Sequence, residues 1–133
     1  MTDQGSSVRR PAEPAALFVT RLVAGAVFVL FGIGKFVSHD SELASFRHYG
    51  LPLPEAMVII VGVVELAGGA LLLAGLHVRP AAFLLAGDMV GAILVAGLGQ
   101  GEVFPSLTLA PVLLLAMVVV IRADEPSATT TSV

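Results

Sequence analysis

The apolar segment at residues 54–76, PEAMVIIVGVVELAGGALLLAGL, constrains the fold more than any other part of the chain. As a helix it can cross a bilayer, whose hydrocarbon core of about 30 Å needs about 20 apolar residues. Glu65 lies at its middle, too far from either end to reach water by snorkelling. A charged group at that depth costs several kcal/mol unless it is protonated, paired or facing a water-filled cavity. What Glu65 contacts inside the membrane is therefore the central question for this sequence.

The composition predicts a protein that crosses the membrane several times. Of the 133 residues, 56% are hydrophobic and only 13% are charged, which is too apolar for a soluble domain of this size. We expect an all-α fold: a four-helix transmembrane bundle with a short interfacial helix between spans 1 and 2. The predicted membrane domain covers residues 15–122, with spans at 15–37, 54–76, 80–99 and 104–121 and disordered polar tails at 1–14 and 123–133.

Several classes of function and processing are not expected from this composition. The chain has no basic surface of the kind that binds nucleic acid. It has no cysteine, so it cannot by itself carry out disulfide exchange, ligate a metal through thiolates or hold an iron–sulfur cluster. A cleavable signal peptide is not predicted, because the first apolar run is too long and no small-residue cleavage site follows it.

Span 1 carries two cations on one narrow face. At about 100° per residue, Arg21, Gly25, Phe28, Gly32 and Lys35 fall together on the helix surface. A face that combines charges with glycines is typical of a surface packed inside a bundle. The alternative is that both cations snorkel to the membrane interfaces. We favour snorkelling for Lys35, near the end of the span, and an inward-facing position for Arg21, which lies deeper.

The segment 38–53 predicts a short helix lying at the membrane surface. Gly50 is a natural end for this helix, and Pro54 suits the first turn of the next one. His48 and Tyr49 are expected to anchor the segment at the interface. The alternative is that these two side chains contact a ligand or a lipid headgroup.

Span 3 contains a second acid, Asp88, at nearly the same depth as Glu65. Gly87 and Gly91 bracket Asp88 in a small-xxx-small pattern, which predicts close packing against another helix. Glycines beside Glu65 predict that a neighbouring backbone comes near enough to bury its carboxylate. These glycines are Gly62, Gly68 and Gly69.

The simplest charge arrangement is an ion pair between Arg21 and Glu65, with Asp88 either in the same network or protonated. By helical rise Arg21 lies about 7 Å inward of the midplane, within reach of a long side chain. Lys35 lies about 13 Å from the midplane on the outer side and would need a tilted helix or a wet crevice to reach either acid. We hypothesise that this cluster is functional; the alternative is a buried pair that only fixes helix register.

Arginines near the span ends predict the orientation. Arg9, Arg10, Arg79 and Arg122 all fall on the side of the two termini. The positive-inside rule then places both termini in the cytoplasm and segment 38–53 outside, in a multi-pass protein of the cell membrane.

The ordered motifs resemble those of the DoxX family of membrane proteins. The resemblance runs from Arg21 through FGIGKF, FRHYGLPLP, VGVVELAGGALLLAGL and RPAAFLLAGDMVGAI to Arg122. Glu65 and Gly69 match the most characteristic pattern of the family, whereas Asp88 is less typical. The resemblance implies a four-helix transmembrane bundle in the cell membrane. Some members of the family are subunits of a thiosulfate:quinone oxidoreductase, and others are thought to assemble with soluble redox or sulfur-transfer enzymes.

The first functional hypothesis is a membrane subunit or accessory of a redox complex, linked to quinone or to sulfur and oxidative-stress chemistry. Candidate catalytic residues, near a quinone headgroup or on a proton path, are Arg21, Glu65 and Asp88; weaker ligand-binding candidates are Lys35, His48 and Tyr49; no metal site is predicted. A redox-enzyme partner or the quinone itself must carry the electrons, because the chain has no flavin motif, haem-ligand pair or cysteine. We therefore do not expect catalysis by this chain alone. The alternatives are a non-catalytic anchor or assembly factor, and a small proton-linked transporter acting as a homo-oligomer.

Overall fold

The computed structural model describes residues 13–123, and this part of the chain is helical with no β-strand. The elements in order are α1 (Ala15–Val37), α2 (His39–His48), α3 (Pro54–Ala74), α4 (Val78–Gly91), the π-helical segments η1 (Ala92–Leu98) and η2 (Val103–Leu107), and α5 (Leu109–Ala123). Four helical stretches are long and apolar enough to cross a membrane: α1, α3, α4 with η1, and η2 with α5. The predicted all-α fold, with a short helix between spans 1 and 2, is confirmed. Apart from Glu13, Pro14 and Ala123, the predicted tails lie outside the described residues.

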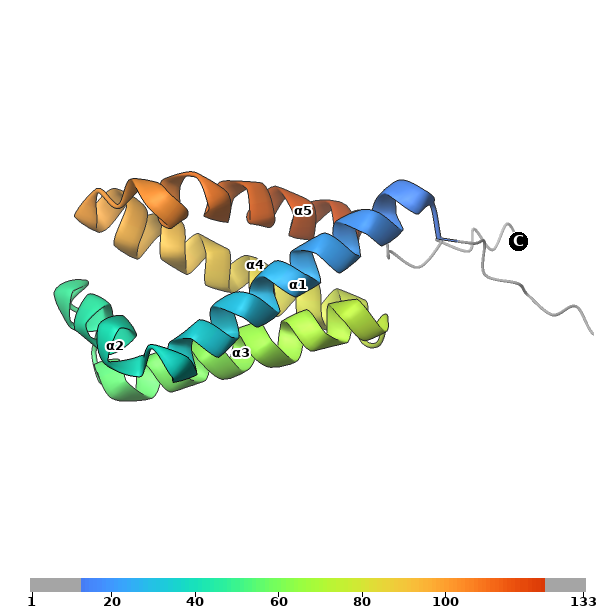
Figure 1. The fold of residues 1–133 in the computed structure, drawn as a ribbon. Helices are drawn as coiled ribbons and strands as arrows, with labels where there is room; N and C mark the ends of the chain where they lie inside the picture. The colour runs from blue at the N-terminus through green and yellow to red at the C-terminus, as the bar shows by residue number, and fades with distance from the viewer. Residues whose placement is uncertain (1–12, 124–133) are drawn as a thin grey trace, which may run out of the picture.

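The helices are arranged as two antiparallel pairs. Helix α1 packs chiefly against α3, and α4 packs chiefly against α5 (Figure 1). The start of α1 and the end of α5 lie at one end of the bundle, and α2 lies at the other. Towards α2 the two pairs diverge, so the bundle is tighter at the end that holds the turn between α3 and α4.

Glycines bring α1 and α3 into backbone contact. A Cβ atom added to Gly69 would lie 2.7 Å from the carbonyl oxygen of Gly25, and one on Gly25 would lie 2.9 Å from the carbonyl oxygen of Gly69. Gly62 meets Phe36 of α1, and Gly68 meets Leu85 of α4, each at 2.9 Å by the same measure. The close approach predicted around Glu65 is therefore confirmed.

The small-xxx-small pattern in α4 behaves differently. Gly87 and Gly91 are exposed, and a Cβ atom added to either would meet nothing within 4 Å. The predicted packing of another helix on these glycines is wrong within the described chain, because α4 presents Leu85 and Met89 to its neighbours instead.

The helix ends follow the local chemistry of the sequence. Gly50 has a positive φ of 73° just after α2, and Gly75 has one of 71° just after α3. Both are positions where a residue without Cβ is favoured. Pro54 lies in the first turn of α3, as predicted. Helix α4 begins at Val78 rather than at the predicted residue 80.

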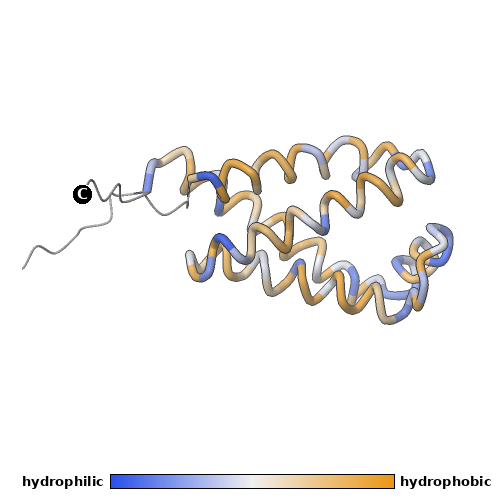
Figure 2. Tube along the Cα trace, turned by 180° about the vertical axis from the view of Figure 1, so that it is seen from behind, coloured by the Kyte–Doolittle hydropathy of each residue, from blue (hydrophilic) through white to orange (hydrophobic). Residues whose placement is uncertain are grey.

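Hydrophobic side chains cover the outside of the spans as well as filling the core. Figure 2 shows hydrophobic residues along the four spans and hydrophilic residues gathered at α2 and near the bundle ends. The largest fully buried side chains include Phe28, Leu72, Leu85 and Met117. Many large apolar side chains remain exposed, which a lipid environment would cover.

Candidate functional site

The intramembrane acid Glu65 is paired with Lys35 of α1. Glu65 is 3% exposed, and the Lys35 Nζ atom lies 3.1 Å from its Oε2 atom. This contact lacks hydrogen-bond alignment, so the same Oε2 atom accepts no hydrogen bond from the described residues. Lys35 also lies 3.9 Å from the Oε2 atom of Glu42. The prediction of a buried acid answered by a cation from a neighbouring helix holds, but the cation is a different one.

The predicted ion pair between Arg21 and Glu65 is wrong, and helix geometry explains why. Helices α1 and α3 run antiparallel, and the Gly25–Gly69 contact sets their register, so Arg21 lies level with Leu72 and about 10 Å along the axis from Glu65. Helical side chains lean towards the N-terminus of their own helix. Arg21 therefore leans away from Glu65, whereas Lys35 and Glu65 lean towards each other. Because of this lean, the Lys35 side chain reaches Glu65 although the two residues lie at different depths. The prediction that Lys35 snorkels to the membrane interface is therefore also wrong.

Arg21 instead stabilises the far end of the bundle. Its Nε atom lies 3.0 Å from the Oε1 atom of Glu13, and its Nη1 atom donates a hydrogen bond to the Leu72 carbonyl near the end of α3. A cation is favourable there because the last carbonyls of a helix carry partial negative charge. Arg21 is 8% exposed and faces inward, as predicted, but the structure does not bring it to the two acids.

Asp88 lies on α4 and lines the same pocket as Glu65 and Lys35. Its Oδ2 atom is buried and has no hydrogen-bond partner among the described residues. Asp88 is close enough to Glu65 and Lys35 for the charges to interact. Two of the three predicted cluster members, Glu65 and Asp88, are therefore brought together.

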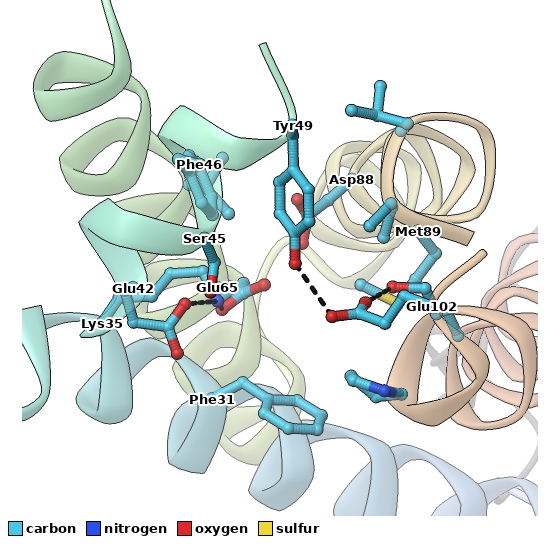
Figure 3. A pocket seen from close by; sticks show the side chains of 18 of the residues that line it. Phe31, Lys35, Glu42, Ser45, Phe46, Tyr49, Glu65, Asp88, Met89 and Glu102 are labelled. Carbon is cyan, nitrogen blue, oxygen red and sulfur yellow. Dashed lines mark hydrogen bonds and ion pairs between the residues drawn. The ribbon is translucent and has the colours of Figure 1, made fainter. Parts of the chain in front are cut away.

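These groups face a pocket of about 520 Å³ that is lined by residues from all the helices (Figure 3). Most of its lining is apolar, with aromatic rings contributed by α1, α2 and the link before α5. Its charged side chains are Lys35, Glu42, Glu65, Asp88 and Glu102. No group of three or more acidic or histidine side chains within residues 13–123 is arranged to hold a metal ion.

Tyr49 closes the α2 side of the pocket. Its hydroxyl donates a 2.9 Å hydrogen bond to Oε1 of Glu102, and the hydroxyl of Ser106 donates to Oε2 of the same carboxylate (Figure 3). Burial raises the pKa of Tyr49 to about 12, and the hydrogen bond and charge of Glu102 act in the same direction. Tyr49 is thus a neutral donor at physiological pH. It joins α2 to the link between spans 3 and 4.

His48 does not line this pocket but lies in a neighbouring hollow that shares Tyr49 and Glu102 with it. Its side chain is exposed and lines a more open hollow together with Ser41 and Gln100. Of the predicted aromatic pair, only Tyr49 lines the pocket of Glu65.

Two acids of the pocket, Glu42 and Glu102, were not among the residues predicted from the sequence. The predicted topology gave one indication of the role of Glu102. It places the link that contains Glu102 on the same side of the membrane as segment 38–53, which contains Glu42 and Tyr49. Which side chains meet there could not be derived without the helix packing.

Comparison with known proteins supports the resemblance seen in the motifs. A family model described as DoxX matches residues 16–98, a range that includes Lys35, Tyr49, Glu65 and Asp88. An uncharacterized membrane protein of Mycobacterium tuberculosis is 40% identical over 86 residues, which are 64% of this chain and 53% of that protein.

Two further relatives have similar coverage. The inner membrane protein YphA of Escherichia coli is 30% identical over 73 residues, 55% of this chain and 52% of YphA. A Bacillus subtilis protein named "Putative oxidoreductase CatD" is 32% identical over 78 residues, 59% of this chain and 57% of CatD. The chain thus spans a little over half the length of these curated relatives. No solved structure matches it.

Proposed function

The chain belongs to the DoxX family of membrane proteins, and from this premise we propose that it is the membrane subunit of a redox complex and binds a quinone in the pocket beside Lys35 and Glu65. The observation that carries the proposal is that the buried ion pair borders a pocket of about 520 Å³. A pair that only fixed helix register would need no such cavity. The volume lies within the range of about 300–1,000 Å³ that is usual for small-molecule sites.

The lining suits a flat, mostly apolar ring with two acceptor oxygens. Phe31 and Phe46 supply aromatic surface for packing. Lys35 supplies an ammonium donor at the pocket wall, whereas the one hydroxyl proton of Tyr49 is already donated to Glu102. A bound quinone would supply chemistry in which two electrons and two protons are exchanged. The residues present therefore fit this cofactor class.

The charged groups suit the handling of protons at such a ring. Glu65 and Asp88 contribute two carboxyls to the pocket, and Lys35 contributes one ammonium. The three groups together are neutral when one carboxyl holds a proton, so a proton can move between them without leaving an unbalanced buried charge. We expect Glu65, with Asp88 beside it, to accept or release one of the two protons that the quinone exchanges, and Lys35 to hold the balancing charge.

Electrons must be exchanged with a partner, because the chain has no cysteine to hold an iron–sulfur cluster or form a redox disulfide. The name of the Bacillus subtilis relative includes the word oxidoreductase, which is consistent with a redox assembly. We propose that the partner is a redox enzyme that contacts this membrane subunit.

Quinone binding and turnover test the proposal with one matched control. Purified protein should bind a benzoquinone or naphthoquinone, and the complex kept intact from native membranes should reduce or oxidise it. Glu65→Gln should lower turnover by about 10²-fold or more, the range for losing a positioned acid or base. Glu55→Gln is the control, because Glu55 is an exposed acid on the same helix and outside the pocket. No quinone binding by the wild type, or equal turnover for both variants, would contradict the proposal.

The two alternative functions give different results in the same preparations. A non-catalytic anchor would retain its partner when Lys35 and Glu65 are both replaced, and would bind no quinone. A proton-linked transporter would show flux in liposomes that depends on Glu65. The pocket beside the charged pair favours a ligand-binding function over simple anchoring.

A further inference from the structure

We propose that the pocket opens sideways into the hydrocarbon core of the membrane between α3 and α4, at Gly87 and Gly91. Through this opening it would take a ligand whose carbonyl-bearing ring lies in the pocket while its lipophilic tail extends into the bilayer. The inference rests on the proposed function and deepens it, because it selects tailed, membrane-dissolved quinones over small water-soluble ones.

The exposure of the lining residues locates the opening. Most residues that line the pocket are buried or half-buried, and the exposed ones are Gly87, Gly91 and Phe104. A Cβ atom on either glycine would meet nothing within 4 Å, so the space beside them is free within the described chain. The pocket therefore reaches the surface of the bundle along the glycine edge of α4.

The depth of these glycines determines what lies outside the opening. The third span runs from Val78 to Leu98, so Asp88 is at its centre. At 1.5 Å per residue, Gly87 and Gly91 lie within about 5 Å of that centre along the axis. At this depth the opening faces acyl chains rather than water. Phe104, the other exposed lining residue, lies instead at the beginning of the last span.

The splay of α3 and α4 produces the opening. The two helices touch where Leu85 packs on Gly68, towards the turn that joins them. Towards α2 they diverge, and Val61 of α3 and Gly91 of α4 both line the pocket there (Figure 1). Larger side chains at the glycine positions would narrow the gap.

Polar groups behind this opening indicate a binding site rather than a packing defect. Asp88 is adjacent to Gly87 in the chain, and its buried Oδ2 atom has no hydrogen-bond partner within the described part of the chain. Glu65, at 3% exposure, lines the same pocket, and its Oε2 atom lies 3.1 Å from the Lys35 ammonium. An amphiphile entering from the bilayer would meet these groups with its carbonyl-bearing ring, and its tail would avoid the cost of leaving lipid.

The test compares two ligands that share one ring. The dissociation constants of 2-methyl-1,4-naphthoquinone and of the same ring with a two-isoprene tail are measured on full-length protein in lipid nanodiscs. The ratio of the two constants is compared among the wild type, Gly91→Leu, Gly87→Leu and Gly34→Leu. Gly34 is the matched control, because it lies in a helix, does not line the pocket, and a Cβ atom added to it would meet nothing within 4 Å.

We expect Gly91→Leu and Gly87→Leu to weaken the tailed ligand relative to the tail-less one by about tenfold, roughly the loss of two buried methylene contacts. Gly34→Leu should leave the ratio unchanged. Equal ratios in all four proteins, with both ligands bound, would overturn the lateral opening alone. Failure of the wild type to bind either ligand would overturn the proposed function, and this inference with it.

Discussion

At the scale of single residues, the direction in which helical side chains lean decides which charges meet. Lys35 and Glu65 lie at different depths, yet each leans towards the other because α1 and α3 are antiparallel. Arg21, on the same face of α1 as Lys35, leans the opposite way and contacts Glu13 and the Leu72 carbonyl. Membership of one helix face is therefore not sufficient for two cations to share a role.

Removing Lys35 should destabilise the protein through the charge left on Glu65. We expect Lys35→Met to lower the free energy of unfolding by about 3–5 kcal/mol, the usual effect of breaking a buried ion pair. Adding Glu65→Gln to Lys35→Met should restore part of this loss, because the buried charge is then gone. Reversible denaturation in mixed micelles would measure the resulting double-mutant cycle.

Two control cycles distinguish this coupling from general damage. The Arg47–Glu55 pair has a 3.3 Å contact but side chains that are 60% and 71% exposed, so its coupling should be below about 1 kcal/mol. A cycle of Arg21→Met with Glu65→Gln should be additive, because these residues do not touch. Strong coupling between Arg21 and Glu65 would contradict the arrangement described above.

Tyr49 gives a second prediction at this scale, on pH dependence. It is the only tyrosine in a chain without tryptophan, so tyrosinate absorbance in the near ultraviolet reports on it alone. Its pKa in the folded protein is raised from 10.0 to about 12, by burial first and then by Glu102. The stability that comes from neutral Tyr49 is therefore fully present below pH 10 and is lost as the pH rises from 10 to about 12.

The tyrosinate titration of the wild type is compared with those of Glu102→Gln and of the unfolded chain. Glu102→Gln should move the midpoint down, but not as far as the ordinary tyrosine value, because burial is the larger cause and remains. The unfolded chain should titrate at that ordinary value. A wild-type midpoint equal to that of the unfolded chain would contradict both the burial of Tyr49 and its contact with Glu102.

At the scale of elements, α1 and α3 form a pair whose contact surface is glycine. Their carbonyl oxygens and backbone nitrogens approach so closely at Gly25 and Gly69 that no side chain fits between them. Helix α2 has a different role, because it covers the wide end of the bundle and is tied there by the hydrogen bond from Tyr49 to Glu102. The Gly25–Gly69 contact fixes the register of α1 against α3, which brings Lys35 to Glu65. The hydrogen bond from Tyr49 to Glu102 closes the pocket.

Substituting the contact glycines should separate the two helices. Gly69→Ala would place a methyl group 2.7 Å from a backbone oxygen, which cannot move without shifting α1. We expect a loss of about 1–3 kcal/mol in unfolding free energy, as for other overpacked sites. Gly34→Ala is the control and should gain about 0.5–1 kcal/mol, because alanine favours the helix and the position is open.

Thermal unfolding followed by circular dichroism would compare these two variants. If Gly69→Ala were as stable as Gly34→Ala, the close approach of α1 and α3 would be wrong, and with it the register that brings Lys35 to Glu65.

At the scale of the whole molecule, four spans place the start of α1 and the end of α5 at one end of the bundle and α2 at the other (Figure 1). The pocket lies where the two helix pairs diverge, between the bundle centre and α2. We propose that the end of the bundle with the start of α1 and the end of α5 faces the cytoplasm, because the arginines near the span ends gather there.

Single cysteines provide a direct check of this orientation, because the chain has none of its own. Asp40, Gln100 and Ala123 lie at the two ends of the bundle, and all three are exposed. In intact cells a membrane-impermeant maleimide should label Asp40→Cys and Gln100→Cys, and should label Ala123→Cys only after lysis. The reverse pattern would show that the protein is inverted, and labelling of all three before lysis would contradict the number of spans.

The sequence by itself determined the fold class, the approximate spans, the presence of a short helix between spans 1 and 2 and the inward position of Glu65. These features depend on hydrophobicity, length and local backbone chemistry, which are properties of one stretch of chain at a time. The glycines beside Glu65 also indicated close packing correctly, because the absence of a side chain is visible without knowing the neighbour.

Only the tertiary structure decided that Lys35, not Arg21, pairs with Glu65, that Glu102 binds Tyr49, and that a pocket adjoins the pair. Each of these depends on the register and splay between helices. A shift of one turn moves a side chain by about 5.4 Å, which is enough to exchange one ion-pair partner for another. That register is set by glycine contacts between distant segments, so no single segment of the sequence contains it.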